Sequence, residues 1–255
     1  MHFQLVQNFP FFTILLCLIS AVICSVLSGK AARFVNTALL ITVTVMNALV
    51  FMYVNMTGES YVYMMGHFPA PWGNEIRVGV LEAFMATFFA IIMLLSMFGG
   101  HHKLLEEVDE EKHRLYYILV NLLLSSLLAL VYTNDLFTAY VFVEINTISA
   151  AGLIMIRQIG RTIEAAVRYM IMSLLGSGLL LMGICMLYDL TGHLLMSNIK
   201  EQVAILATDP NSQVPLMITI TIMSVGLCIK CALFPFHAWL PDAYGYSTVS
   251  SAAML

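Results

Sequence analysis

The sequence predicts an all-α membrane protein, a bundle of about seven membrane-spanning helices. Of its 255 residues, 60% are hydrophobic and only 10% are charged, whereas a soluble globular domain has about 45–50% and 25%. The mean hydropathy is +0.90. Apolar runs long enough to cross a hydrocarbon core of about 30 Å, which takes about 20 helical residues, recur along the whole chain.

Seven such runs can be delimited. In order they cover residues 11–28, 36–56, 78–98, 115–132, 136–156, 165–188 and 214 to about 240. An eighth run begins at Thr248 and is still apolar where the sequence ends, so we expect the sequence to be incomplete at its C-terminus. The first run has no preceding Lys or Arg and no small-residue cleavage site after it, which predicts a retained span and not a signal peptide.

The distribution of Lys and Arg predicts the orientation. Cytoplasmic loops carry an excess of these residues, and here they concentrate in the alternate loops 29–35, 99–114 and 157–168. The intervening loops carry only Arg77 and Lys200. We therefore expect a protein of the inner (cytoplasmic) membrane of the cell with its N-terminus outside and the three basic loops inside.

Several functional classes are excluded by composition and spacing. The formal net charge of −4 provides no basic surface for nucleic acid. The five cysteines lie inside apolar runs and are interpreted as small hydrophobes, and the histidines show neither zinc spacing nor paired haem ligands. The adjacent His101 and His102 are the remaining metal-binding alternative. We expect no cofactor and no metal in this chain.

Two charged residues at membrane depth are the candidate functional residues, since each costs about 2.5–3.5 kcal/mol at a helix centre on insertion scales. Glu144 lies eight residues after Leu136, about 12 Å into its span. Lys230 lies sixteen residues after Val214, about 24 Å along its helix and in the cytoplasmic half. The structural alternatives are a carboxyl buried for packing and a lysine that reaches for the headgroups. Pro235 predicts a helix break beside Lys230, which favours a lysine inside the protein.

Other polar residues receive structural interpretations. Glu82 lies near the outer end of its span and is expected to have an interfacial structural role. Arg168 opens the sixth span as a topology anchor, or else holds a buried carboxylate. Glycines in the same span indicate close helix packing and not a nucleotide-binding loop; they are Gly176, Gly178 and Gly183.

The segment that begins at Lys230 carries a specific resemblance. From Lys230 to Ala243 the sequence KCALFPFHAWLPDA follows the pattern K-x-A-x-x-P-F-H-x-W-L-P-D-A. It resembles the antiporter-like subunits shared by respiratory complex I, Mrp cation/proton antiporters and energy-converting membrane-bound hydrogenases. The segments YVFVEINTISAAGLIMI, which contains Glu144, and EAAVRYMIMSLLGSGLLLMGI, with Arg168 where a lysine is frequent, are similar to the same family. The resemblance extends from PAPWG at 69–73 to the end of the chain.

The resemblance implies a fold and a set of functional residues. The fold is an antiporter-like bundle of about fourteen helices with two inverted five-helix repeats, which divides this chain into three N-terminal helices (1–113) and an incomplete first repeat (114–255). Glu144 and Lys230 match the buried charge pair of the family, with the helix break at Pro235; we expect Arg168, His237 and Asp242 to be accessory residues of the ion path. The segment after the motif, YGYSTVSS, lacks the prolines of many members and favours the hydrogenase or Mrp branch.

The leading hypothesis is a proton- or sodium-translocating subunit of a multisubunit respiratory oxidoreductase, such as an NADH:quinone oxidoreductase or a hydrogenase, without redox chemistry of its own. The second is an Mrp-type cation/proton antiporter subunit without a redox partner. A stand-alone transporter of organic solutes would need more polar groups at the midplane than the spans contain. The expected partners are other membrane subunits, on which the stability of the chain should depend.

Overall fold

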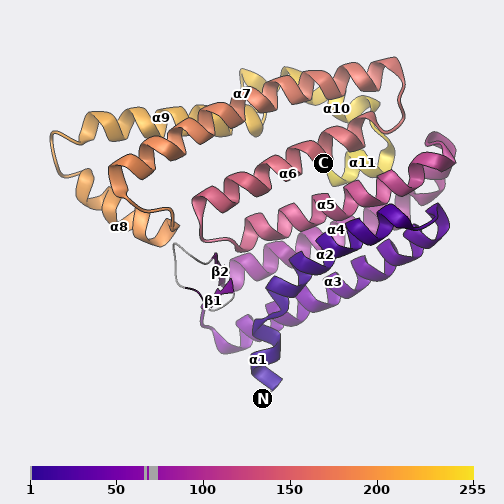
Figure 1. Cartoon of the computed structure of the whole chain (residues 1–255), viewed down its shortest axis with the longest axis horizontal. Coiled ribbons are helices and arrows are strands. Elements are labelled where there is room, and N and C mark those ends of the chain that lie inside the picture. The colour runs from indigo at the N-terminus through magenta and orange to yellow at the C-terminus, as the bar shows by residue number, and fades with distance from the viewer. Residues whose placement is uncertain (1, 66–67, 69–73) are drawn as a thin grey trace.

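The computed structural model describes residues 2–65, 68 and 74–255 as a bundle of long, roughly parallel and antiparallel helices (Figure 1). The PAPWG segment at 69–73 and His67 lie outside the described residues. In chain order the elements are α1 (His2–Gln7), α2 (Phe9–Val26), α3 (Gly29–Thr57), β1 (Tyr61–Met64), β2 (Glu75–Val78), α4 (Val80–Glu107), the 3-10 helix η2 (Glu110–Lys112), α5 (His113–Tyr132), α6 (Leu136–Met155), α7 (Gly160–Thr191), α8 (Met196–Leu206), α9 (Gln213–Lys230), the 3-10 helix η3 (Phe236–Trp239), α10 (Leu240–Tyr246) and α11 (Val249–Met254).

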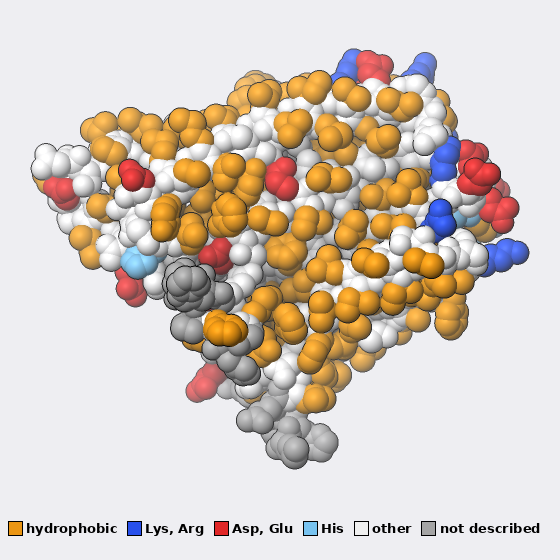
Figure 2. Space-filling view, in the orientation of Figure 1, with side chains coloured by type: hydrophobic (Ala, Val, Ile, Leu, Met, Phe, Trp, Pro, Cys, Tyr) orange, Lys and Arg blue, Asp and Glu red, His pale blue; other side chains and the backbone are white. Residues whose placement is uncertain are grey.

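Seven helices among the described residues are long and apolar enough to cross a membrane: α2, α3, α4, α5 together with η2, α6, α7 and α9. Each overlaps one of the predicted apolar runs. Apolar side chains also cover most of the surface in Figure 2, as the outer face of a bundle surrounded by lipid requires. The predicted all-helical polytopic fold is therefore confirmed.

The predicted loops on the basic side are shorter than expected. α4 continues to Glu107 and α7 begins at Gly160, so most of the segments 99–114 and 157–168 is helical. Hydropathy marks the part of a helix that lies in lipid, but a helix that continues into water keeps its backbone hydrogen bonds and needs no apolar side chains there. In Figure 2 the visible Lys and Arg gather at this end of the bundle.

Two elements at the opposite end were not expected. β1 and β2 form an antiparallel hairpin in which Tyr61 pairs with Val78. Asn134, in the connection between α5 and α6, donates from Nδ2 to Glu75 Oε1 at 2.6 Å and from its backbone nitrogen to Glu75 O at 3.0 Å. The helix α8 is also short. Neither element has the length of a membrane span, so a search for apolar runs could not detect them.

The N-terminal helices are joined to α5 by buried polar side chains. Asn36 on α3 donates to Asn121 on α5 at 2.5 Å, and Asn121 donates to Ser20 on α2 at 3.1 Å. Tyr132, the last residue of α5, donates to Asn47 on α3 at 2.7 Å. Hydrogen bonds of this kind hold helices together in an environment without a hydrophobic driving force. They fix α5, against which α6 packs.

The predicted helix break is present, and α9 ends at Lys230. Its end has the hydrogen bonds of a Schellman motif, because Ala232 N donates to Ile229 O at 3.2 Å and Leu233 N donates to Cys228 O at 3.0 Å. Ala232 has φ 51°, a left-handed conformation that costs a residue other than glycine about 1–2 kcal/mol. The chain resumes after Pro235 with η3 and α10, so the last part of the predicted run, up to about residue 240, lies beyond the break and outside α9.

The second half of the broken helix is held against α7. Arg168 Nη1 on α7 lies 2.7 Å from Asp242 Oδ2 on α10, and Arg168 Nη2 lies 2.6 Å from Glu164 Oε1. The short helix α11 then packs against α4, where Gly100 contacts Ser250. Gly100 has no side chain to separate the two backbones at this point.

The fold places the C-terminal end of α4 and the turn between α8 and α9 at opposite ends of the bundle (Figure 1). On a cysteine-free background, Lys103→Cys and Asp209→Cys should therefore react with a membrane-impermeant maleimide from opposite sides. The distribution of Lys and Arg predicts that the side of Lys103→Cys is the cytoplasmic one. Glu106→Cys, one turn from Lys103, is the matched control. Labelling of Lys103→Cys and Asp209→Cys from the same side would contradict the arrangement of the spans.

Candidate functional site

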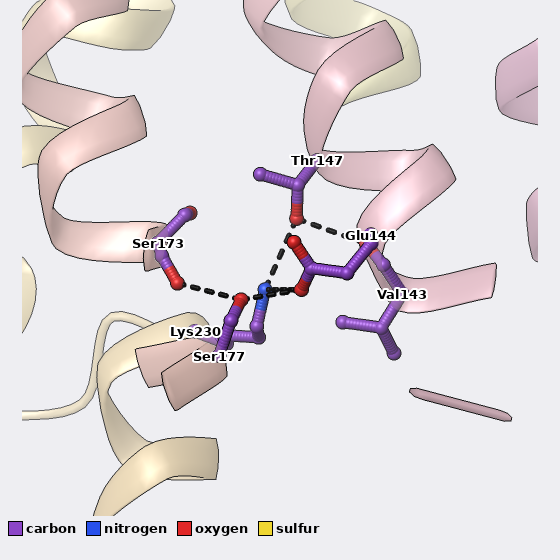
Figure 3. A network of polar contacts seen from close by, with 6 residues as sticks. All are labelled: Val143, Glu144, Thr147, Ser173, Ser177 and Lys230. Atoms are coloured by element: carbon purple, nitrogen blue, oxygen red, sulfur yellow. Dashed lines mark hydrogen bonds and ion pairs between the residues drawn. The ribbon is translucent and has the colours of Figure 1, made fainter. Parts of the chain in front are cut away.

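Glu144 on α6 and Lys230 at the end of α9 form an ion pair inside the bundle (Figure 3). Lys230 Nζ lies 3.1 Å from Glu144 Oε1 and 3.1 Å from Thr147 Oγ1. The side chain of Lys230 is 10% exposed and that of Glu144 is 25% exposed. The structure thus brings together the two membrane-depth charges that the sequence singles out.

Hydroxyl groups from two helices complete the surroundings of the pair. Thr147, three residues after Glu144, donates to Val143 O at 2.9 Å and accepts from the lysine. Ser177 on α7 donates to Glu144 Oε1 and also lies 2.8 Å from Ser173 O. Removal of two charges from water costs several kcal/mol for each ion, and only good geometry and additional hydrogen bonds offset that cost. These hydroxyls supply such bonds.

Close packing of α7 and α9 positions the lysine. A Cβ on Gly226 of α9 would lie 2.8 Å from Gly176 O and 2.9 Å from Leu180 N, both backbone atoms of α7. A Cβ on Gly183 of α7 would meet the side chain of Met223 on α9 and lie 3.2 Å from its backbone nitrogen, whereas a Cβ on Gly178 would meet nothing within 4 Å. The predicted packing role is therefore confirmed for Gly176 and Gly183 and wrong for Gly178.

The expected depths of the two charges need a correction. Counting residues placed Lys230 about twice as far from the outer surface as Glu144, in the cytoplasmic half, yet their side chains are in contact. The physical reason is that α9 begins further toward the end of the bundle where α8 lies than α6 does (Figure 1). The end of α9 therefore reaches the middle of α6.

Lys230 also lines a cavity of about 170 Å³. An ammonium group has three donors, and only two of them are used by Glu144 and Thr147 among the described residues. Polar side chains in the cavity wall include Asn146, Tyr169 and Trp239. Trp239 is 8% exposed, and its Nε1 has no hydrogen-bond partner among the described residues. A polar cavity of this size has room for several water molecules.

Among the described residues, no hydrogen bond or ion pair links the remaining predicted residues to Glu144 or Lys230. Arg168 and Asp242 contact each other, and Arg168 thus follows its second interpretation, holding a carboxylate, although Asp242 is only partly buried. His237 is exposed and stacks on Phe234, with the ring centroids 5.7 Å apart. Glu82 Oε2 accepts from Gly79 N at 3.0 Å, which caps α4 and fits the expected structural role.

Three residues at the site were missed from the sequence: Thr147, Ser177 and Trp239. Thr147 could have been found, because a residue three positions after Glu144 lies on the same helix face. Ser177 and Trp239 gave no comparable signal, since their relation to the pair depends on how α6, α7 and η3 pack together. No group of three or more possible metal ligands occurs among the described residues.

A comparison with known families matches residues 133–255 to the model described as "NADH:quinone oxidoreductase/Mrp antiporter, TM". NADH-quinone oxidoreductase subunit N of Desulforudis audaxviator (strain MP104C) is 32% identical over 203 residues, 78% of this chain and 38% of the relative. A probable K(+)/H(+) antiporter subunit of Rhizobium meliloti (strain 1021) is 27% identical over 189 residues, 74% of this chain and 34% of the relative. The chain thus spans about a third of the length of these relatives.

Two solved structures share the fold. An archaeal membrane-bound sulfane sulfur reductase complex contains a chain with a TM-score of 0.82 and 22% identity, aligned over 98% of this chain and 51% of that one. The Mrp complex from Dietzia sp. DQ12-45-1b contains a chain with a TM-score of 0.81 and 24% identity, aligned over 98% and 45%. The antiporter-like fold expected from the sequence is thereby confirmed.

The close approach of α7 and α9 can be tested with two glycines. Gly226→Ala should destabilise the protein by about 1–3 kcal/mol, the usual cost of overpacking, because the new methyl group meets backbone atoms that cannot move aside. Gly178→Ala is the control, since its methyl group meets nothing within 4 Å. The measurement is the thermal unfolding midpoint of the purified assembly. Equal midpoints for the two variants would show that this packing is not required.

Proposed function

Because residues 133–255 belong to the transmembrane family shared by NADH:quinone oxidoreductase subunits and Mrp antiporters, we propose that this chain translocates protons or sodium ions. We place it in a multisubunit respiratory oxidoreductase of the complex I or membrane-bound hydrogenase type. The observation that carries the proposal is the Glu144–Lys230 ion pair, with its Nζ–Oε1 distance of 3.1 Å, inside an otherwise apolar bundle. Ionisable residues in such positions mark ion paths and proton relays.

The proposed mechanism is a change in the proton affinity of the lysine. An ammonium group beside a carboxylate keeps its proton, whereas a buried ammonium that loses its counter-charge is destabilised and tends to release it. A charge that approaches along the ion path would attract one member of the pair and separate the two. Lys230 is suited to such a movement because the helix ends at this residue, so its side chain and the following backbone are not held by a continuing helix.

The cavity beside Lys230 provides the place to which the lysine would release its proton in the proposed path. It lies next to the lysine and has polar wall residues from α6 and the broken-helix segment, Asn146 and Trp239. Water there would accept the proton that the ammonium releases. The contact between Lys230 and Glu144 leaves no space between them for another cation, which favours a proton over sodium as the ion that this pair carries.

Arg168, Asp242 and His237 have accessory roles in this proposal. The Arg168–Asp242 contact at 2.7 Å joins α10 to α7 and so holds the wall of the cavity in place. His237 is exposed and follows the helix break, where we propose that it contributes to the ion path. We further propose that the N-terminus lies outside the inner membrane and that the partners are other membrane subunits of the complex.

An Mrp-type antiporter subunit without a redox partner is the alternative. The similarity to the Rhizobium meliloti relative, named as a probable K(+)/H(+) antiporter subunit, favours it, and the same ion pair would serve. Identification of the subunits that co-purify with this chain separates the two. Iron–sulfur or hydrogenase subunits support the oxidoreductase, and their absence from a complete assembly supports the antiporter.

Substitutions in the pair test the proposed function. Glu144→Gln and Lys230→Ala should each abolish driven ion translocation in membrane vesicles, because each removes one of the two exchanging charges. Lys230→Arg should fail or be strongly impaired, because arginine stays protonated at any working pH and cannot release a proton. The measurement is a pH or sodium gradient across vesicles that contain the assembled complex.

Asp209→Asn provides a control, because this carboxylate lies in the turn before α9 and bonds only to Ser212 and Asn211 among the described residues. It should pump normally. Near-normal pumping by Lys230→Arg would show that the side chain acts as a fixed charge, and the proton-carrier role would be withdrawn. Normal pumping by Glu144→Gln would contradict the proposed function itself.

A further inference from the structure

The hydroxyl group of Ser177 lies within hydrogen-bond distance of two acceptors. One is Glu144 Oε1 on α6, and the other is Ser173 O, one turn earlier on α7, at 2.8 Å (Figure 3). A serine hydroxyl has a single hydrogen and two lone pairs. It can therefore bond fully to only one of these acceptors at a time, and the charge on Glu144 decides which.

With Glu144 ionised, the hydrogen of Ser177 points to the carboxylate. Hydrogen bonds to a charged acceptor are roughly twice as strong as those between neutral groups, so the carboxylate takes it in preference to the carbonyl of Ser173. Ser173 O remains bonded within the helix, and its second lone pair is not needed. Lys230 donates to the same carboxylate oxygen.

With Glu144 protonated, the direction of the bond reverses. A carboxylic acid is a donor, and a lone pair of Ser177 Oγ can accept its hydrogen. The hydrogen of Ser177 then rotates to Ser173 O, 2.8 Å away. The proton on the carboxyl group comes from Lys230 or from the ion path, as one N–H or O–H bond breaks and the carboxyl O–H bond forms. Ser177 itself neither gains nor loses a proton.

Ser177 is buried, so its hydroxyl group cannot form a hydrogen bond with solvent in place of these partners. The residue is only 3% exposed, and an unpaired donor or acceptor in such a place costs about 1–3 kcal/mol. The other titratable groups near Glu144 are Lys230 on α9 and the phenols of Tyr140 on α6 and Tyr169 on α7. Neither phenol forms a hydrogen bond with Glu144 among the described residues.

We propose that Ser177 is a positioning residue for proton transfer at Glu144, because its hydroxyl gives both the ionised and the protonated carboxyl group a hydrogen-bond partner. This inference rests on the proposed function and adds one step to it, in which Glu144 takes up and releases a proton during each cycle. Without the hydroxyl, either state of Glu144 loses a bond. Ion translocation then slows although both charges of the pair are still present.

The test compares substitutions of equal shape. Threonine and valine have the same outline, but only threonine has a hydroxyl group. In vesicles that contain the assembled complex, Ser177→Val should pump about tenfold or more slowly, as expected for the loss of a hydrogen bond to a charged group, whereas Ser177→Thr should retain most of its rate. Ser177→Ala, which adds no volume, should resemble Ser177→Val.

Ser173→Ala is the matched control on the same helix. It removes a hydroxyl one turn away from Ser177 but keeps the carbonyl that accepts from Ser177, so pumping should be close to normal. An infrared difference spectrum gives a second readout. The carboxylic C=O band that is missing in Glu144→Gln should move to higher wavenumber in Ser177→Val, because the acid has lost its acceptor, and should stay in place in Ser173→Ala.

Equal pumping by Ser177→Val and Ser177→Thr with an unmoved band would overturn the role of Ser177, and so would an equal loss in both while Ser177→Ala pumps normally. Either outcome, with Glu144→Gln inactive, leaves the proposed function intact. Normal pumping by Glu144→Gln would instead remove the proposed function, and this inference with it.

Discussion

The structure has to accommodate a charged carboxylate and a charged ammonium inside an apolar bundle, and the arrangement of the other elements depends on this requirement. Each ion loses several kcal/mol of hydration when it is buried, and their attraction offsets this only at close range. The observed distance of 3.1 Å between Lys230 Nζ and Glu144 Oε1 provides that range. The hydroxyl groups of Thr147 and Ser177 form further hydrogen bonds with the pair. Replacement of a buried pair by apolar residues is often neutral or stabilising, so stability alone gives no reason for these charges.

The helices around the pair are arranged so that it can form. Gly176 and Gly226 let the backbones of α7 and α9 approach closely, and the end of α9 at Lys230 leaves the lysine at a free helix terminus. Helix C-termini carry partial negative charge and favour a cation there. Polar links between α2, α3 and α5 hold the support on which α6 lies. The ion pair thus joins α6, which is held by its neighbours, to α9, where the helix is broken.

Much of this arrangement could be predicted from the sequence. The seven spans follow from hydropathy, and the candidate pair follows from the rarity of charges such as Glu144 at membrane depth. The features that could not be predicted depended on tertiary packing or on short elements. The depth of Lys230 could not be counted along α9, because α9 begins closer than α6 to the end of the bundle where α8 lies. Ser177 could not be distinguished from other serines of α7, and the β1–β2 hairpin is too short to leave a hydropathy signal.

The central claim is that Glu144 and Lys230 are present for charge exchange and not to hold the helices together. The most direct measurement is proton pumping and thermal stability of the same assembled complex with the double substitution Glu144→Gln/Lys230→Met. This removes both charges and keeps the approximate shapes. We predict a complex about as stable as the unsubstituted one, because no unpaired buried charge remains, and no pumping. A double variant that pumps at a near-normal rate would contradict the account.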